Sequence, residues 1–444
     1  MRSVREFLAQ ECANLKTVLE ETLRLKYGLV GTGSKEFYEE CEARLTFLAD
    51  EVSKVDESDH DGLQNLSFLL NQLTGLVSRI ERSSISEYSW PFVDELKRVA
   101  TSLCTEATVT NPKTPPQFYV FAGGGLDAYA INPEVNRPSG GSRRIHTIIF
   151  PRTLKHFVLL HSILGHEVGH AMWRCSQHQN ALKSIFNTHL FNAGIFANPT
   201  ATASWLYLDT APDRVKKFLS GLAPRGITAN NLFGSFANWQ AWVEEILCDF
   251  VGLLTFGPSF IAAECNLLLA ISPSGADFGT DHPPVGCRLN YLLSAAEIMG
   301  HTTEQFLNTA TKNRVGAFWS HLATKRQANP WFDVFTPKQI KDTTDALGQL
   351  LDSLPPALYP KPTELDLSGL IDQLSHFIPP VGAKFNSDYK LELSLVDFRH
   401  VLYAGWVVAA DPPPQVSFAQ INRLCEHGIM QQHAIGLQLS KLIT

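Results

Sequence analysis

Apolar residues recur at helical spacing through the first 110 positions of the chain. In residues 63–83 they fall every three or four positions, which places one apolar stripe along one face of a helix. Residues 36–55 follow the same pattern, and the polar run 56–62 indicates a loop between two antiparallel helices. The stripe consists of Leu63, Leu66, Leu70, Leu73, Val77 and Ile80. We expect a helical N-terminal region over 1–110 that packs on the main domain or, alternatively, binds a protein partner.

A proline-rich segment at 111–116 ends this pattern, and the period then changes. Residues 117–123 and 143–151 are β-branched and aromatic runs bounded by Gly, Ser and Pro, which is typical of strands. Helical spacing returns from about 154 to 350, and prolines punctuate the remainder. The prediction is therefore a mostly helical α+β protein. Its parts are a helical region at 1–110, a domain with a small antiparallel or mixed sheet at 111–350, and a Pro-rich, loop-rich region with short helices at 351–444.

The composition is that of a globular protein, with 44 % hydrophobic and 18 % charged residues in a chain of 444. The net charge of −7 makes nucleic acid a poor default partner. We expect no membrane span, because no run of 18 apolar residues occurs. The eight cysteines are dispersed without a C-x-x-C pair, and the N-terminus is too charged for a signal peptide. These features predict a cytoplasmic protein of a reducing compartment.

The candidate chemistry begins with the motif HEVGH at 166–170. On a helix over 156–175, His166 and His170 lie one turn apart on the same face, where two imidazoles can chelate one zinc ion. Glu167 follows the first histidine and can reach a metal-bound water. Gly165 and Gly169 stand beside the two histidines and suggest that something packs very close to the backbone there. The alternative is a polar helix face with solvated histidines.

A catalytic zinc needs a third protein ligand, and a second helical segment at 238–254 supplies candidates. Glu245 and Asp249 are four residues apart and share a face of that helix. Glu245 can ligate zinc, while Asp249 accepts the second ring N–H of a ligating histidine and fixes its tautomer. We expect the neighbouring Glu244 to lie in solvent. The alternative is that all of these are ordinary surface carboxylates.

HEVGH followed by E-x-x-x-D resembles the glutamate-ligand zinc metallopeptidases, the gluzincins. Two further features, DAYAI at 127–131 before a strand and DHPPVGCRL at 281–289, are similar to motifs of the family that contains the membrane heat-shock protease and the CAAX prenyl endopeptidase. The resemblance covers about 118–300. The chain departs from that pattern in having no membrane helices and in Asp127, where Asn is commoner. Residues 200–231 are a candidate insertion over the cleft.

The resemblance implies a zincin-like domain that holds one Zn²⁺ per chain and hydrolyses peptide bonds in a protein or peptide substrate. Glu167 would be the general base, and His282 would stabilise the oxyanion. Arg288 would organise a loop or bind a substrate carbonyl, with a structural ion pair as the alternative. An edge strand would pair with an extended substrate. Its residues are Ile145, His146, Thr147, Ile148 and Ile149.

Two other functions stay open at this point. The first is a catalytically silent interaction or scaffold protein with a retained zincin fold, which uses its N-terminal helices to bind a partner. The intact HEVGH motif together with Glu245 argues against it. The second is a zinc hydrolase of a non-peptide amide, because the ligand set does not specify the substrate.

Overall fold

A computed structural model gives the fold, and the chain divides into two compact units. Unit 1 contains Met1–Lys97, Cys104–Lys155 and Arg174–Gln177, and unit 2 contains Arg98–Leu103, His156–Trp173 and His178–Thr444. The structure describes residues 3–26, 34–82, 90–105, 116–123, 129–132, 144–175, 177–191, 238–275, 279–303, 309–327, 335–354, 357–362, 364–385, 391–393 and 395–443. The candidate insertion at 200–231 and Asp127 lie outside these residues.

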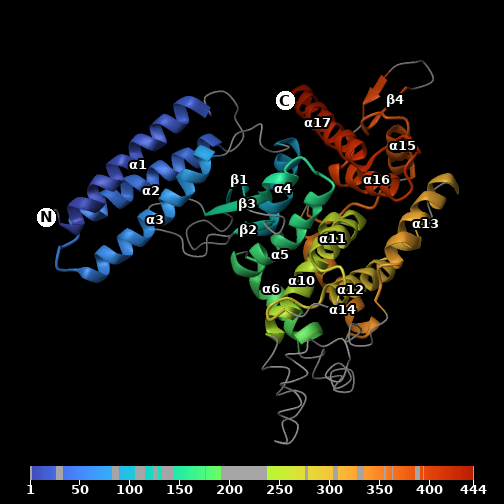
Figure 1. Ribbon diagram of the computed structural model, residues 1–444, viewed down its shortest axis with the longest axis horizontal. Coiled ribbons are helices and arrows are strands. Elements are labelled where there is room, and N and C mark those ends of the chain that lie inside the picture. Colours follow the sequence, from blue (N-terminus) through green and yellow to red (C-terminus); the bar gives the residue numbers. More distant parts are fainter. Residues whose placement is uncertain are drawn as a thin grey trace, which may run out of the picture. The chain divides into compact units, whose positions relative to one another are not determined.

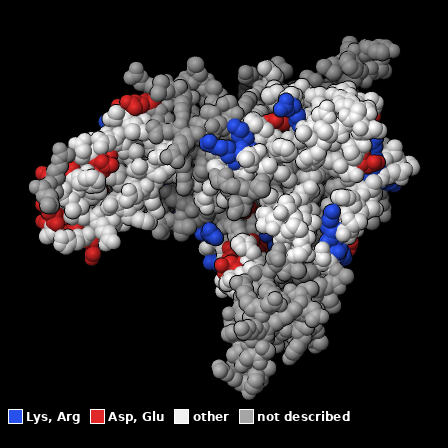
Figure 2. Space-filling model, viewed as in Figure 1, with Lys and Arg blue, Asp and Glu red and all other residues white. Residues whose placement is uncertain are grey.

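The N-terminal helices of unit 1 confirm the predicted helical region. Helices α1 (Val4–Lys26), α2 (Ser34–Lys54) and α3 (His60–Arg82) lie side by side (Figure 1), and α4 (Trp90–Cys104) follows them in the chain. The first three share one apolar core, to which α3 contributes Leu63, Leu66, Leu70, Leu73 and Val77. These are the predicted stripe, apart from Ile80, whose side chain is outside the described residues. The charged side chains on the visible face of α1–α3 are mostly acidic (Figure 2).

The three-stranded sheet of unit 1 corrects the predicted edge strand. Strands β1 (Gln117–Gly123), β2 (Ala130–Asn132) and β3 (Ile145–Pro151) form a mixed sheet in the order β1-β3-β2. Strand β3 is central, since it pairs with β1 along its whole length and with β2 at Thr147–Ile149. The backbone of Thr147, Ile148 and Ile149 is paired on both sides, so the prediction that these residues form an edge strand open to a substrate is wrong. Ile145 and His146 pair with β1 on one side. A continuous apolar run is typical of a strand buried on both faces, and the sequence pattern does not show which strands flank it.

Unit 2 is almost entirely helical. The predicted helix over 156–175 is shorter than expected, because Leu160–Ile163 is a 3₁₀ turn and the α-helix begins at Leu164. None of the described helices is long and apolar enough to cross a bilayer. The elements of the unit are α5 (Leu164–Cys175), α6 (Gln179–Ile185) with a π-helical extension (Phe186–Phe191), α10 (Trp239–Phe256), α11 (Pro258–Ile271), α12 (Val285–Ile298), a 3₁₀ turn (His301–Thr303), α13 (Thr309–Ala323), α14 (Pro337–Asp352), α15 (Glu364–Ser375), β4 (Ala383–Phe385), β5 (Leu391–Leu393), α16 (Phe398–Ala410) and α17 (Phe418–Ile443).

The C-terminal region is more helical and more integrated than its prolines suggested. Helix α16 is buried over most of its length, and its Trp406 Nε1 donates a hydrogen bond to the carbonyl of Leu159 at 3.1 Å. Arg399 Nη1 donates to the carbonyl of Thr255 at 2.8 Å. The residues after 350 therefore belong to the same compact unit as the histidine helix, and the two units divide the chain differently from the three predicted regions. The prolines end helices, but they do not separate this region from the core.

Helices α5 and α10 approach each other backbone to backbone. A Cβ atom at Gly169 would lie 2.9 Å from Cα of Cys248, and one at Gly165 would lie 3.0 Å from Cα of Gly252. Both distances are too short for a side chain to be inserted without moving a helix. The expectation that something packs tightly against the two glycines is confirmed. This crossing brings the histidines of α5 to the carboxylates of α10.

We expect Gly169→Ala to lower the free energy of unfolding by about 1–3 kcal/mol, because the new methyl group meets helix backbone that cannot yield. The control is Gly316→Ala on α13, where a Cβ atom meets nothing within 4 Å. That change removes a glycine from a helix interior and is expected to stabilise by up to about 1 kcal/mol. Urea unfolding of the wild type and both variants measures these changes. If Gly169→Ala were as stable as Gly316→Ala, the close crossing would be contradicted.

Candidate metal centre

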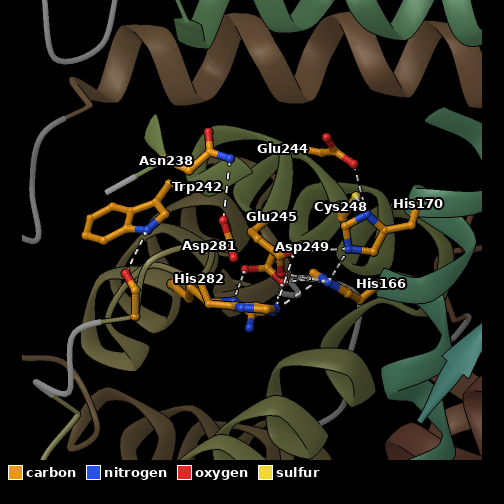
Figure 3. A network of polar contacts seen from close by, with 12 residues as sticks. His166, His170, Asn238, Trp242, Glu244, Glu245, Cys248, Asp249, Asp281 and His282 are labelled. Carbon is orange, nitrogen blue, oxygen red and sulfur yellow. Dashed lines mark hydrogen bonds and ion pairs between the residues drawn. The ribbon is translucent and has the colours of Figure 1, made fainter. Parts of the chain in front are cut away.

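Three side chains from two helices converge at one point (Figure 3): His166 and His170 from α5 and Glu245 from α10. The two Nε2 atoms are 3.1 Å apart. The carboxylate of Glu245 places Oε2 3.2 Å from Nε2 of His166 and Oε1 3.2 Å from Nε2 of His170. Ligand atoms that sit about 2.0–2.1 Å from a tetrahedral zinc ion are about 3.3 Å from one another. The predicted ligands therefore have the spacing of a zinc site.

The atoms that face the centre of this cluster are incompletely satisfied by the protein. Oε2 of Glu245 is buried and makes no hydrogen bond, although it lies close to His166. The two facing Nε2 atoms cannot both carry a proton at their separation, because the two N–H groups would collide. A divalent cation between the three side chains would satisfy the carboxylate and both imidazoles. Two imidazoles with one carboxylate are a donor set that suits zinc.

The outward nitrogen of each imidazole meets a carboxylate of α10. Nδ1 of His166 is 2.7 Å from Oδ1 of Asp249, as predicted for that aspartate. Nδ1 of His170 is 3.1 Å from Oε1 of Glu244. Such partners make Nδ1 the protonated nitrogen and direct the Nε2 lone pairs toward a metal. Each histidine of the motif is thus oriented by a separate carboxylate.

The placement of Glu244 corrects the expectation that it lies in solvent. Its side chain is 19 % exposed and is directed to His170. A signal was present in the sequence: two chelating histidines have two outward nitrogens, and Asp249 can serve only one of them. The adjacent pair Glu244–Glu245 puts a second carboxylate within reach of the same helix.

Arg288 on α12 binds Asp249 with two hydrogen bonds. Its Nε donates to Oδ2 at 2.8 Å and its Nη2 to Oδ1 at 2.6 Å, and the side chain is buried. Of the predicted alternatives, the structural ion pair is the one present, and the catalytic role of Arg288 stays a prediction. Burial acts to raise the pKa of Asp249, but Arg288 and His166 outweigh it and lower that pKa. Arg288 thus keeps ionised the carboxylate that orients His166.

Glu264 of α11 is a neighbour that sequence reasoning missed. It is buried, and its Oε1 lies 3.8 Å from Nη2 of Arg288. Burial raises its pKa to about 7. The residue stands in a mostly apolar stretch, 260–271, and nothing in the pattern of that stretch indicates that Glu264 faces the cluster.

His282 lies at the exposed rim of the centre. Its side chain is 67 % exposed, and its Nε2 is 3.6 Å from Oε1 of Glu245. The loop that carries it is held on the first turn of α10 (Figure 3). Nε1 of Trp242 donates to the carbonyls of Gly279 and Thr280 at 3.2 and 3.1 Å, and the N–H of Asn238 donates to Thr280 at 2.8 Å. The structure thus brings His282 to the predicted ligands, and Trp242 is a positioning residue that the sequence analysis did not single out.

Glu167 is half-buried on α5, next to His166 in the chain. Its carboxylate makes no hydrogen bond or ion pair with any of the described residues, in contrast to Glu244, Glu245 and Asp249. Glu167, the acidic residue of the HEVGH motif, therefore takes no part in holding the histidines.

The charges of the cluster favour bound cations. Burial by itself would lower the pKa of His166, but Asp249 and Glu245 raise it well above its usual value. Burial likewise acts against the charged form of His170, and Cys248, Glu244 and Glu245 together raise its pKa. Despite burial, the two histidines hold the pKa of Glu245 far below its usual range. The carboxylates thus favour positive charge at the two imidazoles, which a bound proton or a metal ion can supply.

The chain matches no known protein family, no curated protein and no solved structure. The resemblance to gluzincins, the zincin-like domain and the zinc ion therefore stay predictions. Their support is the geometry of the cluster.

Zinc uptake is expected to release protons, with an apparent affinity that keeps rising with pH above 6.5. The reason is that zinc binds neutral imidazole, while the raised pKa of His166 keeps a proton there through neutral pH. Calorimetric titration of the metal-free protein in buffers of low and high ionisation enthalpy, between about pH 6 and 8.5, measures both quantities. An affinity that levels off near the ordinary histidine pKa of about 6.5 would contradict the raised value.

We expect Glu244→Ala to weaken zinc binding by about 10–100-fold, because His170 loses the carboxylate that orients its ring. Gln240→Ala is the matched control, since Gln240 is an exposed residue one turn earlier on the same helix. Competition with a chelating dye gives the dissociation constants. If both variants bind zinc as tightly as the wild type, Glu244 does not orient His170 for metal binding.

Proposed function

We propose that the chain is a zinc-dependent endopeptidase in which water, activated at the metal, attacks a peptide carbonyl with Glu167 as the general base. The observation that carries the proposal is the convergence of His166, His170 and Glu245 within 3.2 Å of one another, with a separate carboxylate behind each imidazole. Three protein ligands that leave a fourth position open distinguish catalytic zinc sites from structural ones. The exposed His282 beside Glu245 indicates that this cluster reaches the surface.

Zinc held by these three side chains would lower the pKa of water to near 7 and polarise the substrate carbonyl. Glu167 takes a proton from the attacking water and passes it to the leaving amine as the C–N bond breaks. His282, whose Nε2 lies 3.6 Å from Glu245, would donate a hydrogen bond to the oxyanion that develops on the carbonyl oxygen. Asp249 and Glu244 hold the two imidazoles in the tautomer that leaves Nε2 unprotonated.

The arrangement favours a hydrolase over the silent scaffold. A scaffold needs neither a cluster that extends to the surface nor an acidic residue beside it that is free of structural contacts, and Glu167 is such a residue. The donor set is shared by hydrolases of other amides, so a peptide as the substrate rests on the resemblance of the four motifs.

The test compares full-length wild type with Glu167→Gln for zinc content and for cleavage of an unfolded protein and a mixed peptide library. We expect about one zinc per chain in both proteins and about 10²–10⁴-fold lower turnover in the variant, because the base is lost while the ligands remain. Glu297→Gln on α12 changes an exposed glutamate outside the centre and is expected to leave turnover unchanged.

Two outcomes would count against the proposal. If the wild-type protein takes up no zinc, the proposed metal centre does not exist. If the zinc-loaded protein hydrolyses small amides but no peptide, it is a hydrolase of non-peptide amides instead of an endopeptidase. Comparison of the protein termini in cells that express the wild type or Glu167→Gln then identifies the substrates.

A further inference from the structure

Unit 2 contains a cavity of about 540 Å³ whose lining residues are all outside the metal centre. It lies between the C-terminal half of α10, the end of α12, helix α14 and the segment 357–361. The volume falls within the range of about 300–1,000 Å³ that is typical of small-molecule sites. Most of the wall is apolar and includes Leu254, Ile298, Met299, Leu358 and the ring of Tyr359. The cavity is therefore suited to the apolar body of a small molecule.

One polar side chain in this wall is buried without a hydrogen bond. His301 is 3 % exposed, and its Nε2 is buried without a hydrogen-bond partner among the described residues. Burial, assisted by the positive charge of Lys361, lowers its pKa to about 4, so the ring is neutral and offers one donor and one acceptor. An imidazole left unsatisfied in this way costs about 1–3 kcal/mol. A ligand oxygen that accepts its N–H would remove that cost.

The charged residues of the cavity favour an anion. Lys361 is exposed and makes no ion pair with a described residue. Asp345, the other charged residue of the lining, is already paired with Lys341 on α14. A positive charge is thus uncompensated beside His301, whose pKa it depresses. A carboxylate at this point would pair with Lys361 and accept the N–H of His301.

Gly348 of α14 lines the cavity, and the space beside it is unfilled. A Cβ atom at this position meets nothing within 4 Å, although the residue lies inside the helix. Glycine in a helix interior costs about 1 kcal/mol relative to alanine. A larger side chain at Gly348 can therefore be introduced without a clash, and it would occupy space beside the cavity.

We propose that this cavity binds an apolar small molecule carrying one carboxylate, with the carboxylate at Lys361 and His301 and the apolar body against Leu254 and Tyr359. The site is independent of the proposed peptidase activity, because it shares no residue with the metal centre.

The first test is calorimetric titration of the full-length protein with decanoate and with decanol, which has the same chain length but no charge. We expect decanoate to bind with one molecule per chain and at least tenfold more tightly than decanol. Lys361→Gln is expected to reduce the affinity for decanoate to that for decanol, whereas Lys338→Gln, on an exposed lysine of α14 outside the lining, leaves it unchanged. Equal binding of the two probes by the wild type, or no binding of either, would overturn the proposal.

The second test places a side chain in the open part of the wall. Gly348→Trp is expected to weaken decanoate binding at least tenfold, while Gly316→Trp, at the glycine of α13 with equally open surroundings, leaves it unchanged. Thermal unfolding shows that both variants are folded. A folded Gly348→Trp protein that binds decanoate like the wild type would show that the probe occupies another site.

Discussion

Helices α5 and α10 cross with no side chain between their backbones at Gly165 and Gly169, and the geometry of the metal centre follows from that contact. Glycine at these positions lets Cα of Cys248 and Cα of Gly252 approach where any other residue would separate the helices. If a methyl group pushed the two helices apart, Glu245 would move away from His166 and His170. Its carboxylate oxygens now lie 3.2 Å from Nε2 of each histidine. Glycine destabilises a helix, but here it permits the close crossing that brings the three candidate metal ligands together.

Electrostatic balance explains why the same crossing is suited to a divalent cation. Glu244, Glu245 and Asp249 contribute three negative charges and Arg288 one positive charge, so these four residues carry a net charge of −2 beside neutral histidines. The nearby carboxylates raise the pKa of both histidines, and a doubly charged ion can take the place of a proton bound there. Burial of the ion pair between Arg288 and Asp249 makes this arrangement rigid, because neither group can turn away without leaving a buried charge unpaired.

Helix α10 links the two sites of unit 2. Its N-terminal half carries Glu245 and holds the loop of His282 through Trp242, while its C-terminal half contributes Leu254 to the cavity. The helix ends at Gly257, whose φ of 63° turns the chain, and the carbonyl of Leu254 accepts a hydrogen bond from the N–H of Tyr359 at 2.7 Å. The segment after residue 350 therefore completes the end of the helix and one wall of the cavity. This is the physical reason why the C-terminal region belongs to the same core.

The sequence by itself determined the elements and the spacing of the ligands: the helical period predicted α3, α5 and α10, and a four-residue interval put His166 with His170 and Glu245 with Asp249 on shared faces. Periodicity reports which face of an element is buried, but not which element buries it. Only the tertiary structure therefore decided that β3 is a central strand, that Glu244 turns to His170, and that Arg288 binds Asp249. Each of these depends on contacts between residues far apart in the chain. A local pattern of apolar and polar positions does not show which distant residues come into contact.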